Sequence, residues 1–290
     1  MTLDTIFPEK IQYIPEFLIK NFRNHEHRLF KLVSNNDGFY KVIETNPKKV
    51  FLMQTPHKYY INIIDGLIPL ETILSLSLSS LLQNLHDNEI ETAKDYQISN
   101  SRYVRTLIWL ITNIYIRNPK RIREAVTEYP TDSTILLQTL GKILGYNKMF
   151  GLGLLIPYNV LSTQFHKDYE SFIREWHIHG FHEFKYVDCM NYGYNLEIFI
   201  APSDSPGFIL SEDPVKYDNR AIEIWEMPIS KHYFVRLQCG TSRKPLDPAR
   251  RSSKIKVKTI PTEQVTEINY NQMTGSKCTI IPYENLSRIL

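Results

Sequence analysis

The hydrophobic pattern of this chain changes once, near residue 183, and this change limits the folds that the chain can adopt. In 62–180, apolar side chains recur at the three- and four-residue spacing of amphipathic helices. In 181–290, short runs of aromatic and β-branched residues are separated by Pro, Gly, Asn and Asp, which is typical of strands joined by turns. Helices followed by strands predict an α+β fold, with about five helices packed on a mostly antiparallel sheet.

The segment 101–117 is predicted to form the central helix. Its apolar residues lie nearly all round the helix, so other parts of the protein have to cover every face. A stripe of leucine and isoleucine predicts a second helix at 71–85. The remaining helices of this half are predicted at 119–126, 131–144 and 162–176.

A β-hairpin is predicted at 28–44, because two apolar runs flank Asp37-Gly38 and glycine supplies the positive φ of a tight turn. The stretch 55–62 is expected to be a loop or a short strand. No linker or repeat separates the halves, so the hairpin should join the later sheet and 1–290 should form one composite domain. The later strands are predicted at 184–190, 194–202, 206–211, 221–229 and 232–240, followed by a helix at 262–273, a closing strand and a short last helix.

Composition excludes several classes of protein. Of the 290 residues, 42% are hydrophobic, which suffices for a sizeable core, and the net charge of +3 carries no global nucleic-acid signature. The cysteines, Cys189, Cys239 and Cys278, form no CxxC pair, which is typical of a reducing compartment. The N-terminal residues lack a secretion signal, and the longest apolar runs are too short to cross a bilayer. We therefore expect a cytoplasmic protein that does not enter the membrane.

Several short motifs follow one another along nearly the whole chain. They include QYIPEFLIKNF at 12–22, the helix end Arg117-Asn118-Pro119, SEDP at 211–214, and VTEINYNQMTGSKCTII at 265–281. In this order they resemble the bacterial domain-of-unknown-function family forty-two thirty-eight, whose members open with His-Tyr-Val-Pro. Gln12 stands where the family has histidine. If that histidine is a catalytic base, the resemblance implies that this member is inactive or different, because an amide takes no proton at neutral pH.

Six polar residues are candidates for one ligand-binding pocket. Arg117 ends the central helix, where it can form a forked pair with Asp213 or hold an anionic ligand. Ser211 and Asp213 end a predicted strand, and polar side chains at such ends often meet ligands. Alternatively, the Arg117–Asp213 pair only joins the two halves, and Ser211 and Asp213 only stabilise a turn. The full set is Gln12, Arg117, Ser211, Asp213, Asn269 and Gln272.

A basic stretch near residue 250 is a candidate nucleic-acid-binding segment, because releasing counterions from phosphates favours binding to clustered cations. A smaller basic cluster, at 120–123, follows Pro119. Alternatively, the stretch is a solvated loop followed by an edge strand whose lysines prevent pairing with other chains. The cations of the stretch are Arg243, Lys244, Arg250, Arg251, Lys254, Lys256 and Lys258.

The chain carries no recognisable metal or catalytic motif. His177, His179 and His182 lie close together, but their spacing matches neither a helical HExxH pattern nor a zinc finger, so we predict no metal site. A phosphate-binding glycine loop and a GxSxG nucleophile elbow are also missing, and the sequence leaves the cofactor unknown.

Three functions are compatible with these features. The first is a binding or sensing protein that recognises an anionic ligand such as a nucleotide or nucleic acid, with a protein from the same operon as a further candidate partner. By analogy with other bacterial orphan families, its setting would be phage defence or a toxin–antitoxin system. The second is a metal-dependent phosphodiester hydrolase that uses acids in 204–213 and histidines in 177–182. The third is a structural subunit without a small-molecule site.

Overall fold

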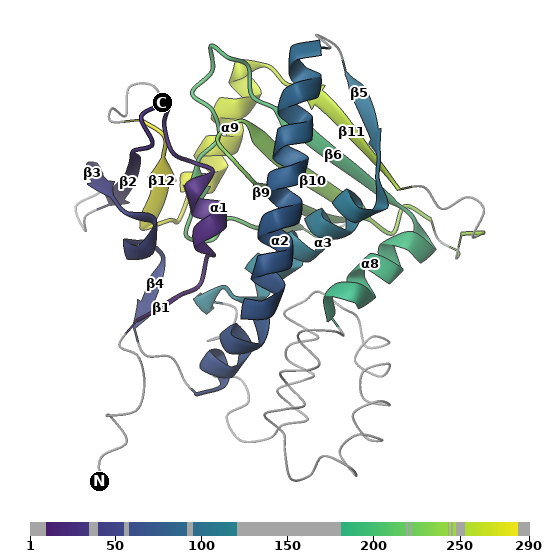
Figure 1. The fold of residues 1–290 in the computed structure, drawn as a ribbon, viewed down its shortest axis with the longest axis horizontal. Coiled ribbons are helices and arrows are strands. Elements are labelled where there is room, and N and C mark those ends of the chain that lie inside the picture. The colour runs from purple at the N-terminus through teal and green to yellow at the C-terminus, as the bar shows by residue number, and fades with distance from the viewer. Residues whose placement is uncertain are drawn as a thin grey trace.

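The fold is α+β, as predicted, with helices packed on mostly antiparallel sheets (Figure 1). The predicted helices at 131–144 and 162–176, and the short last helix, lie outside the described residues, so these predictions remain. The computed structural model describes residues 10–34, 40–54, 58–91, 95–120, 181–218, 220, 222–242, 244, 246–247 and 253–283.

The largest sheet has six strands in the order β5-β11-β6-β10-β9-β8. Neighbouring strands pair antiparallel, except for β11 and β6, which are parallel. Because β11 lies between two strands, the alternative that its lysines protect a sheet edge is wrong. The strands are β5 (Tyr96–Ser99), β6 (Tyr194–Ile200), β8 (Lys216–Asp218), β9 (Glu223–Pro228), β10 (Tyr233–Cys239) and β11 (Lys254–Thr259).

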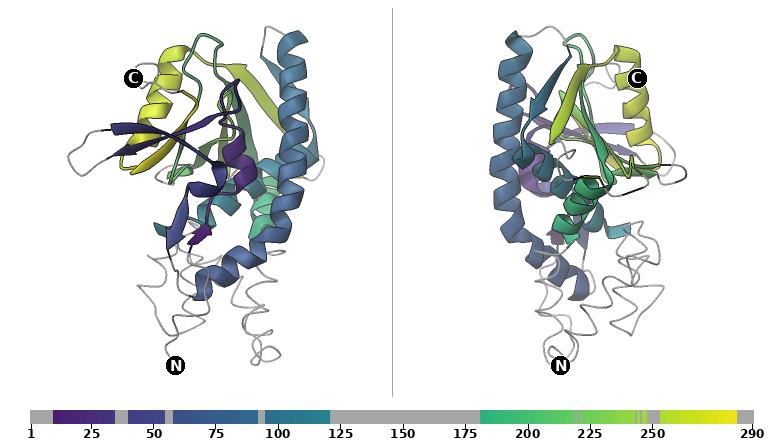
Figure 2. Two further views of the ribbon diagram at one scale, coloured as in Figure 1. Left: turned by 60° about the vertical axis from the view of Figure 1, so that its left-hand side comes forward. Right: turned by 90° about the vertical axis from the view of Figure 1, so that its right-hand side faces the viewer.

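Helices cover both faces of this sheet. Figure 2 shows α2 and α9 on opposite sides of the strands. Alternate strand residues face the two sides, so Ile198 packs in the large core beneath α2 and α3, whereas its neighbour Phe199 packs in a smaller core with Val265 of α9. The helices are α2 (Lys58–Glu91), α3 (Ser101–Ile116), α8 (Phe181–Tyr192) and α9 (Thr262–Met273).

The predicted hairpin exists, but it joins a second, four-stranded sheet in the order β3-β2-β12-β7. This sheet pairs the N-terminal hairpin with β12, so distant parts of the chain lie side by side. Its strands are β2 (Leu29–Ser34), β3 (Tyr40–Thr45), β7 (Leu210–Ser211) and β12 (Cys278–Ile281), and the short elements beside it are β1 (Lys10–Gln12), α1 (Glu16–Lys20), η2 (Pro47–Lys49) and β4 (Leu52–Gln54).

The prediction of a strand at 184–190 is wrong, because this segment lies in α8. Aromatic residues suggested a strand, but the side chains that contact the core, Lys185, Cys189 and Tyr186, follow helical spacing. The β-branched Val187 is 42% exposed. The expected loop or short strand at 55–62 is also wrong from Lys58 onward, where α2 begins. None of the described helices is long and apolar enough to cross a membrane.

Candidate functional site

Arg117 is a buried connector between elements. Its side chain is 2% exposed, and its guanidinium forms an ion pair through Nη1 with Glu71 of α2. Nη2 donates a hydrogen bond to the backbone oxygen of Gln12 at 3.3 Å. Arg117 therefore ties the end of α3 to both α2 and β1.

Asp213 receives its hydrogen bond from the neighbour of Arg117. Asn118 Nδ2 donates to Asp213 Oδ1 at 2.7 Å, and Asn118 Oδ1 accepts from the backbone N–H of Lys120 at 2.8 Å. The contact between the two halves that we predicted for Arg117 is thus made by Asn118, while Arg117 binds Glu71. This network fixes the chain at the end of α3 against the segment that follows β7.

Asn269 and Gln272 hold the segment 207–214 against α9. Both are 1% exposed. Asn269 Oδ1 accepts from the N–H of Ile209 at 3.2 Å, and its Nδ2 donates to the oxygen of Gly207 at 2.8 Å. Both ends of the Asn269 carboxamide therefore form hydrogen bonds with buried backbone groups, and buried polar groups are normally satisfied in this way.

Gln272 makes the same kind of contact one turn later. Its Oε1 accepts from Ser211 Oγ at 2.6 Å, and its Nε2 donates to the oxygen of Pro214 at 2.9 Å. Ser211 is itself fully buried. The geometry thus assigns Ser211, Asn269 and Gln272 to positioning the chain at Glu212 and Asp213 and gives them no ligand contact.

Gln12 also has a positioning role. Its Nε2 donates to the backbone oxygens of Pro47 at 2.6 Å and Val50 at 3.0 Å. These bonds fix η2 beside β1. The next residue, Tyr13, is 8% exposed, and its ring packs on Phe51 with centroids 6.0 Å apart.

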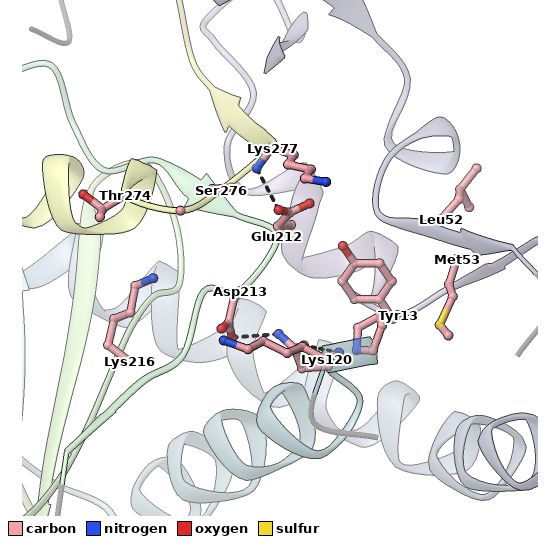
Figure 3. A pocket seen from close by; sticks show the side chains of 13 residues that line it. Tyr13, Leu52, Met53, Lys120, Glu212, Asp213, Lys216, Thr274, Ser276 and Lys277 are labelled. Carbon is pink, nitrogen blue, oxygen red and sulfur yellow. Dashed lines mark hydrogen bonds between the residues drawn. The ribbon is translucent and has the colours of Figure 1, made fainter. Parts of the chain in front are cut away.

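A hollow of about 650 Å³ lies where these segments meet, and we call it the lysine pocket. Its cations come from separate elements: Lys120 follows α3, Lys216 begins β8, and Lys277 precedes β12. Figure 3 shows Asp213, Lys120 and Lys216 directed toward this hollow. The complete lining is Tyr13, Leu52, Met53, Asn118, Pro119, Lys120, Glu212, Asp213, Lys216, Thr274, Gly275, Ser276 and Lys277.

The acids of the lysine pocket already have hydrogen-bond donors. Glu212 Oε1 accepts from the backbone N–H of Lys277 at 2.7 Å, and Asp213 accepts from Asn118. By contrast, the ammonium groups of Lys120 and Lys277 make no hydrogen bond or ion pair with any residue that the structure describes. The lining holds three lysines and two acids, so its net charge is positive, which favours an anion.

A second hollow, of about 420 Å³, adjoins the lysine pocket, and we call it the side pocket. It adds two further cations, Lys31 of β2 and Lys49 of η2. The sequence did not predict either pocket, because lysines scattered over separate elements form no motif. Of these lysines, only Lys120 belongs to a cluster that is recognisable in the sequence, the one at 120–123. The complete lining of the side pocket is Tyr13, Lys31, Lys49, Val50, Phe51, Leu52, Glu212 and Cys278.

The described lysines of the predicted basic stretch line neither pocket. Arg243, Arg250 and Arg251 are outside the described residues, and Lys244 is exposed. In β11, Lys254 and Lys256 are exposed on one face of the central sheet.

The β11 lysines belong to a row of alternating charge across the sheet. The register aligns Lys256 with Glu197, Glu197 with Arg236, and Arg236 with Glu226. Lys258 Nζ binds Glu197 at 3.2 Å, and Arg236 pairs with Glu226. Opposite charges on neighbouring strands stabilise a sheet, so part of the positive charge predicted for nucleic acid is used within the fold.

Neither metal ligands nor a reactive thiol are found in the described part of the chain. No group of three His, Cys, Asp or Glu side chains there could hold a metal ion. His177 and His179 lie outside it, so the hydrolase alternative stays a prediction. Burial raises the pKa of Cys239, and it raises the pKa of Cys278 to about 11, which keeps both thiols protonated at neutral pH.

Comparisons of this chain with protein-family models, with curated proteins and with solved structures found no match. The resemblance to family forty-two thirty-eight therefore stays a prediction.

Proposed function

We propose that this protein is a binding or sensing component that recognises an anionic ligand, a nucleotide or nucleic acid, in the lysine pocket. The observation that carries the proposal is the convergence of Lys120, Lys216 and Lys277 from three separate elements on one hollow. Charge-assisted hydrogen bonds from ammonium groups to phosphate are about twice as strong as neutral ones.

The rest of the pocket suits a phosphate ester of an organic group. A volume of about 650 Å³ falls within the roughly 300–1,000 Å³ of pockets that bind small molecules. Tyr13, Leu52 and Met53 add apolar surface beside the cations. Apolar surface makes no favourable contact with inorganic phosphate, but it can contact a base or a sugar.

The test is a binding measurement with matched variants. We expect CMP and AMP to bind the full-length protein in calorimetric titrations. Lys120→Ala/Lys277→Ala should weaken binding at least tenfold, because hydrogen bonds to charged groups contribute about 1.5–3 kcal/mol each. The control is Lys254→Ala/Lys256→Ala, which removes the same charge from two exposed side chains of β11.

The control also separates the two predicted basic regions. Unchanged binding by the Lys254/Lys256 variant supports the lysine pocket. Equal losses of nucleotide affinity in both variants would show that only the overall charge matters. Unchanged nucleotide affinity in the Lys120/Lys277 variant would refute the site. The setting in phage defence or a toxin–antitoxin system, with a partner protein from the same operon, stays a prediction.

A further inference from the structure

The lysine pocket and the side pocket share one wall. Tyr13, Leu52 and Glu212 line both hollows. Since cavities with common lining residues are adjacent, a ligand in the lysine pocket that extends past these three residues enters the side pocket. The two pockets therefore lie on either side of these three residues, and a ligand that reaches both has to pass over them.

The charges along this path are arranged in two groups. Three lysines line the lysine pocket, Lys31 and Lys49 line the side pocket, and the shared wall carries an acid and no lysine. Neither Lys31 nor Lys49 has a hydrogen bond or ion pair from its ammonium group to the part of the chain that the structure describes. A compact anion needs one group of cations. Two groups separated by an acid match a ligand whose anionic groups are spaced apart.

The wall between the groups suits a nucleobase. Leu52, which is 36% exposed, supplies apolar surface there, and Tyr13, which is 8% exposed, lines the same wall. Glu212 accepts the N–H of Lys277 through Oε1 only, so Oε2 is left to accept another hydrogen bond. A carboxylate repels phosphate but accepts from an exocyclic amino group, such as N4 of cytosine. The order along the path is thus cations, base-binding surface, cations.

We propose that the ligand is a single-stranded oligonucleotide that crosses this wall. Its phosphates lie against the lysines of both pockets, and one base lies against Tyr13 and Glu212. Proteins that bind single strands combine a positive groove for the backbone with apolar or aromatic surfaces for the bases. This inference rests on the proposed function and adds a ligand class, a length and a direction past Glu212.

The experiment compares ligand lengths by competition against fluorescein-labelled hexacytidylate, measured by anisotropy with the full-length protein. We expect hexacytidylate to bind at least tenfold more tightly than CMP. Lys31→Ala/Lys49→Ala should remove most of this gain and leave the affinity for CMP unchanged. The matched control is Lys41→Ala/Lys48→Ala, which removes two exposed lysines from β3 and η2 that line neither pocket.

Salt dependence gives a second readout. If each lysine neutralises one phosphate, the slope of log K against log salt for hexacytidylate is roughly −3.5 with five contacts and roughly −2 with three. The Lys31/Lys49 variant should show the shallower slope, and the control should keep the steeper one.

Three outcomes would overturn the inference. CMP could bind as tightly as hexacytidylate, the Lys31/Lys49 variant could behave like its control, or inorganic polyphosphate of equal charge could compete as well as hexacytidylate, which would leave no role for a base. In each case, CMP binding that depends on Lys120 and Lys277 would still support the proposed function. Absence of binding by every probe would refute both.

Discussion

Replacing Asn269 by alanine tests whether the buried amides of α9 position the site or bind its ligand. The variant removes the acceptor of the Ile209 N–H and the donor to the Gly207 oxygen, and both backbone groups are buried. A buried polar group left without a partner costs about 1–3 kcal/mol, so losing both partners should lower the free energy of unfolding by about 2–6 kcal/mol.

The segment that Asn269 holds has little freedom to find new partners. Gly207 has a φ of +70°, and a Cβ atom there would lie 2.6 Å from the backbone oxygen of Lys231. The chain therefore passes so close to the turn at Lys231 that only glycine fits. Because this contact limits relaxation, the loss should fall in the upper half of the expected range.

Urea unfolding, followed by tryptophan fluorescence and by circular dichroism, measures the loss. With an m-value of about 3 kcal/mol/M, a loss of about 4 to 6 kcal/mol lowers the urea midpoint by roughly 1.3 to 2 M. Coincident transitions with the two probes would justify a two-state analysis. Asn271→Ala is the matched control, because Asn271 is exposed on the same helix and should change stability by less than about 0.5 kcal/mol.

The result can refute the reasoning in two ways. A cost below about 1 kcal/mol for Asn269→Ala, or one equal to that of Asn271→Ala, would show that the amide does not satisfy this backbone. Unchanged stability combined with lost CMP binding would instead return Asn269 to the ligand-binding residues.

Two further predictions concern buried charge and pH. Arg117→Met should lower the free energy of unfolding, measured in urea, by about 3 kcal/mol. This is the low end of the range for breaking a buried pair, because the Glu71 side chain is 24% exposed. A loss below about 1 kcal/mol would contradict the connector role. Cys278, whose pKa is raised from 9.0 to about 11 by burial, should react with iodoacetamide at a rate that keeps rising between pH 9 and 11, because only the thiolate reacts. The contribution of the protonated Cys278 thiol to the free energy of unfolding is fully present below pH 9 and is lost as the pH rises toward 11. A rate at Cys278 that levels off near pH 9, read by peptide mass analysis, would contradict the raised pKa.

Hydrophobic periodicity and residue type in the sequence predicted several elements of the fold. Helix α9 spans Thr262–Met273, as predicted, and α3 ends one residue before the predicted 117. Strands β9 and β10 fall within their predicted runs for the same reason. The pattern failed at α8, because aromatic side chains occur in strands and in buried helix faces alike. Residue type alone does not separate these two cases.

The site was less predictable than the fold, because burial decides what a polar residue does. The sequence pointed to Asp213, which lines the lysine pocket, and to Asn269 and Gln272, which do not. An asparagine that satisfies buried backbone and one that binds a ligand look the same in a sequence. Lys216 and Lys277 carried no signal at all, because their proximity depends on how β8 and the α9–β12 turn meet.

Under the proposed function, the two acids of the lysine pocket make it selective, while the three lysines keep its net charge positive. A hydrogen bond from a neutral amide does not remove the charge of a carboxylate, so Glu212 and Asp213 still repel phosphate. The Lys277 N–H holds Glu212 and Asn118 Nδ2 holds Asp213, so the position of each negative charge is fixed by the fold. Glu212 lines the wall that the lysine pocket shares with the side pocket, so under the proposed function a ligand that places a phosphate at this wall binds less tightly. Repulsion of this kind discriminates between ligands in a way that more cations would not.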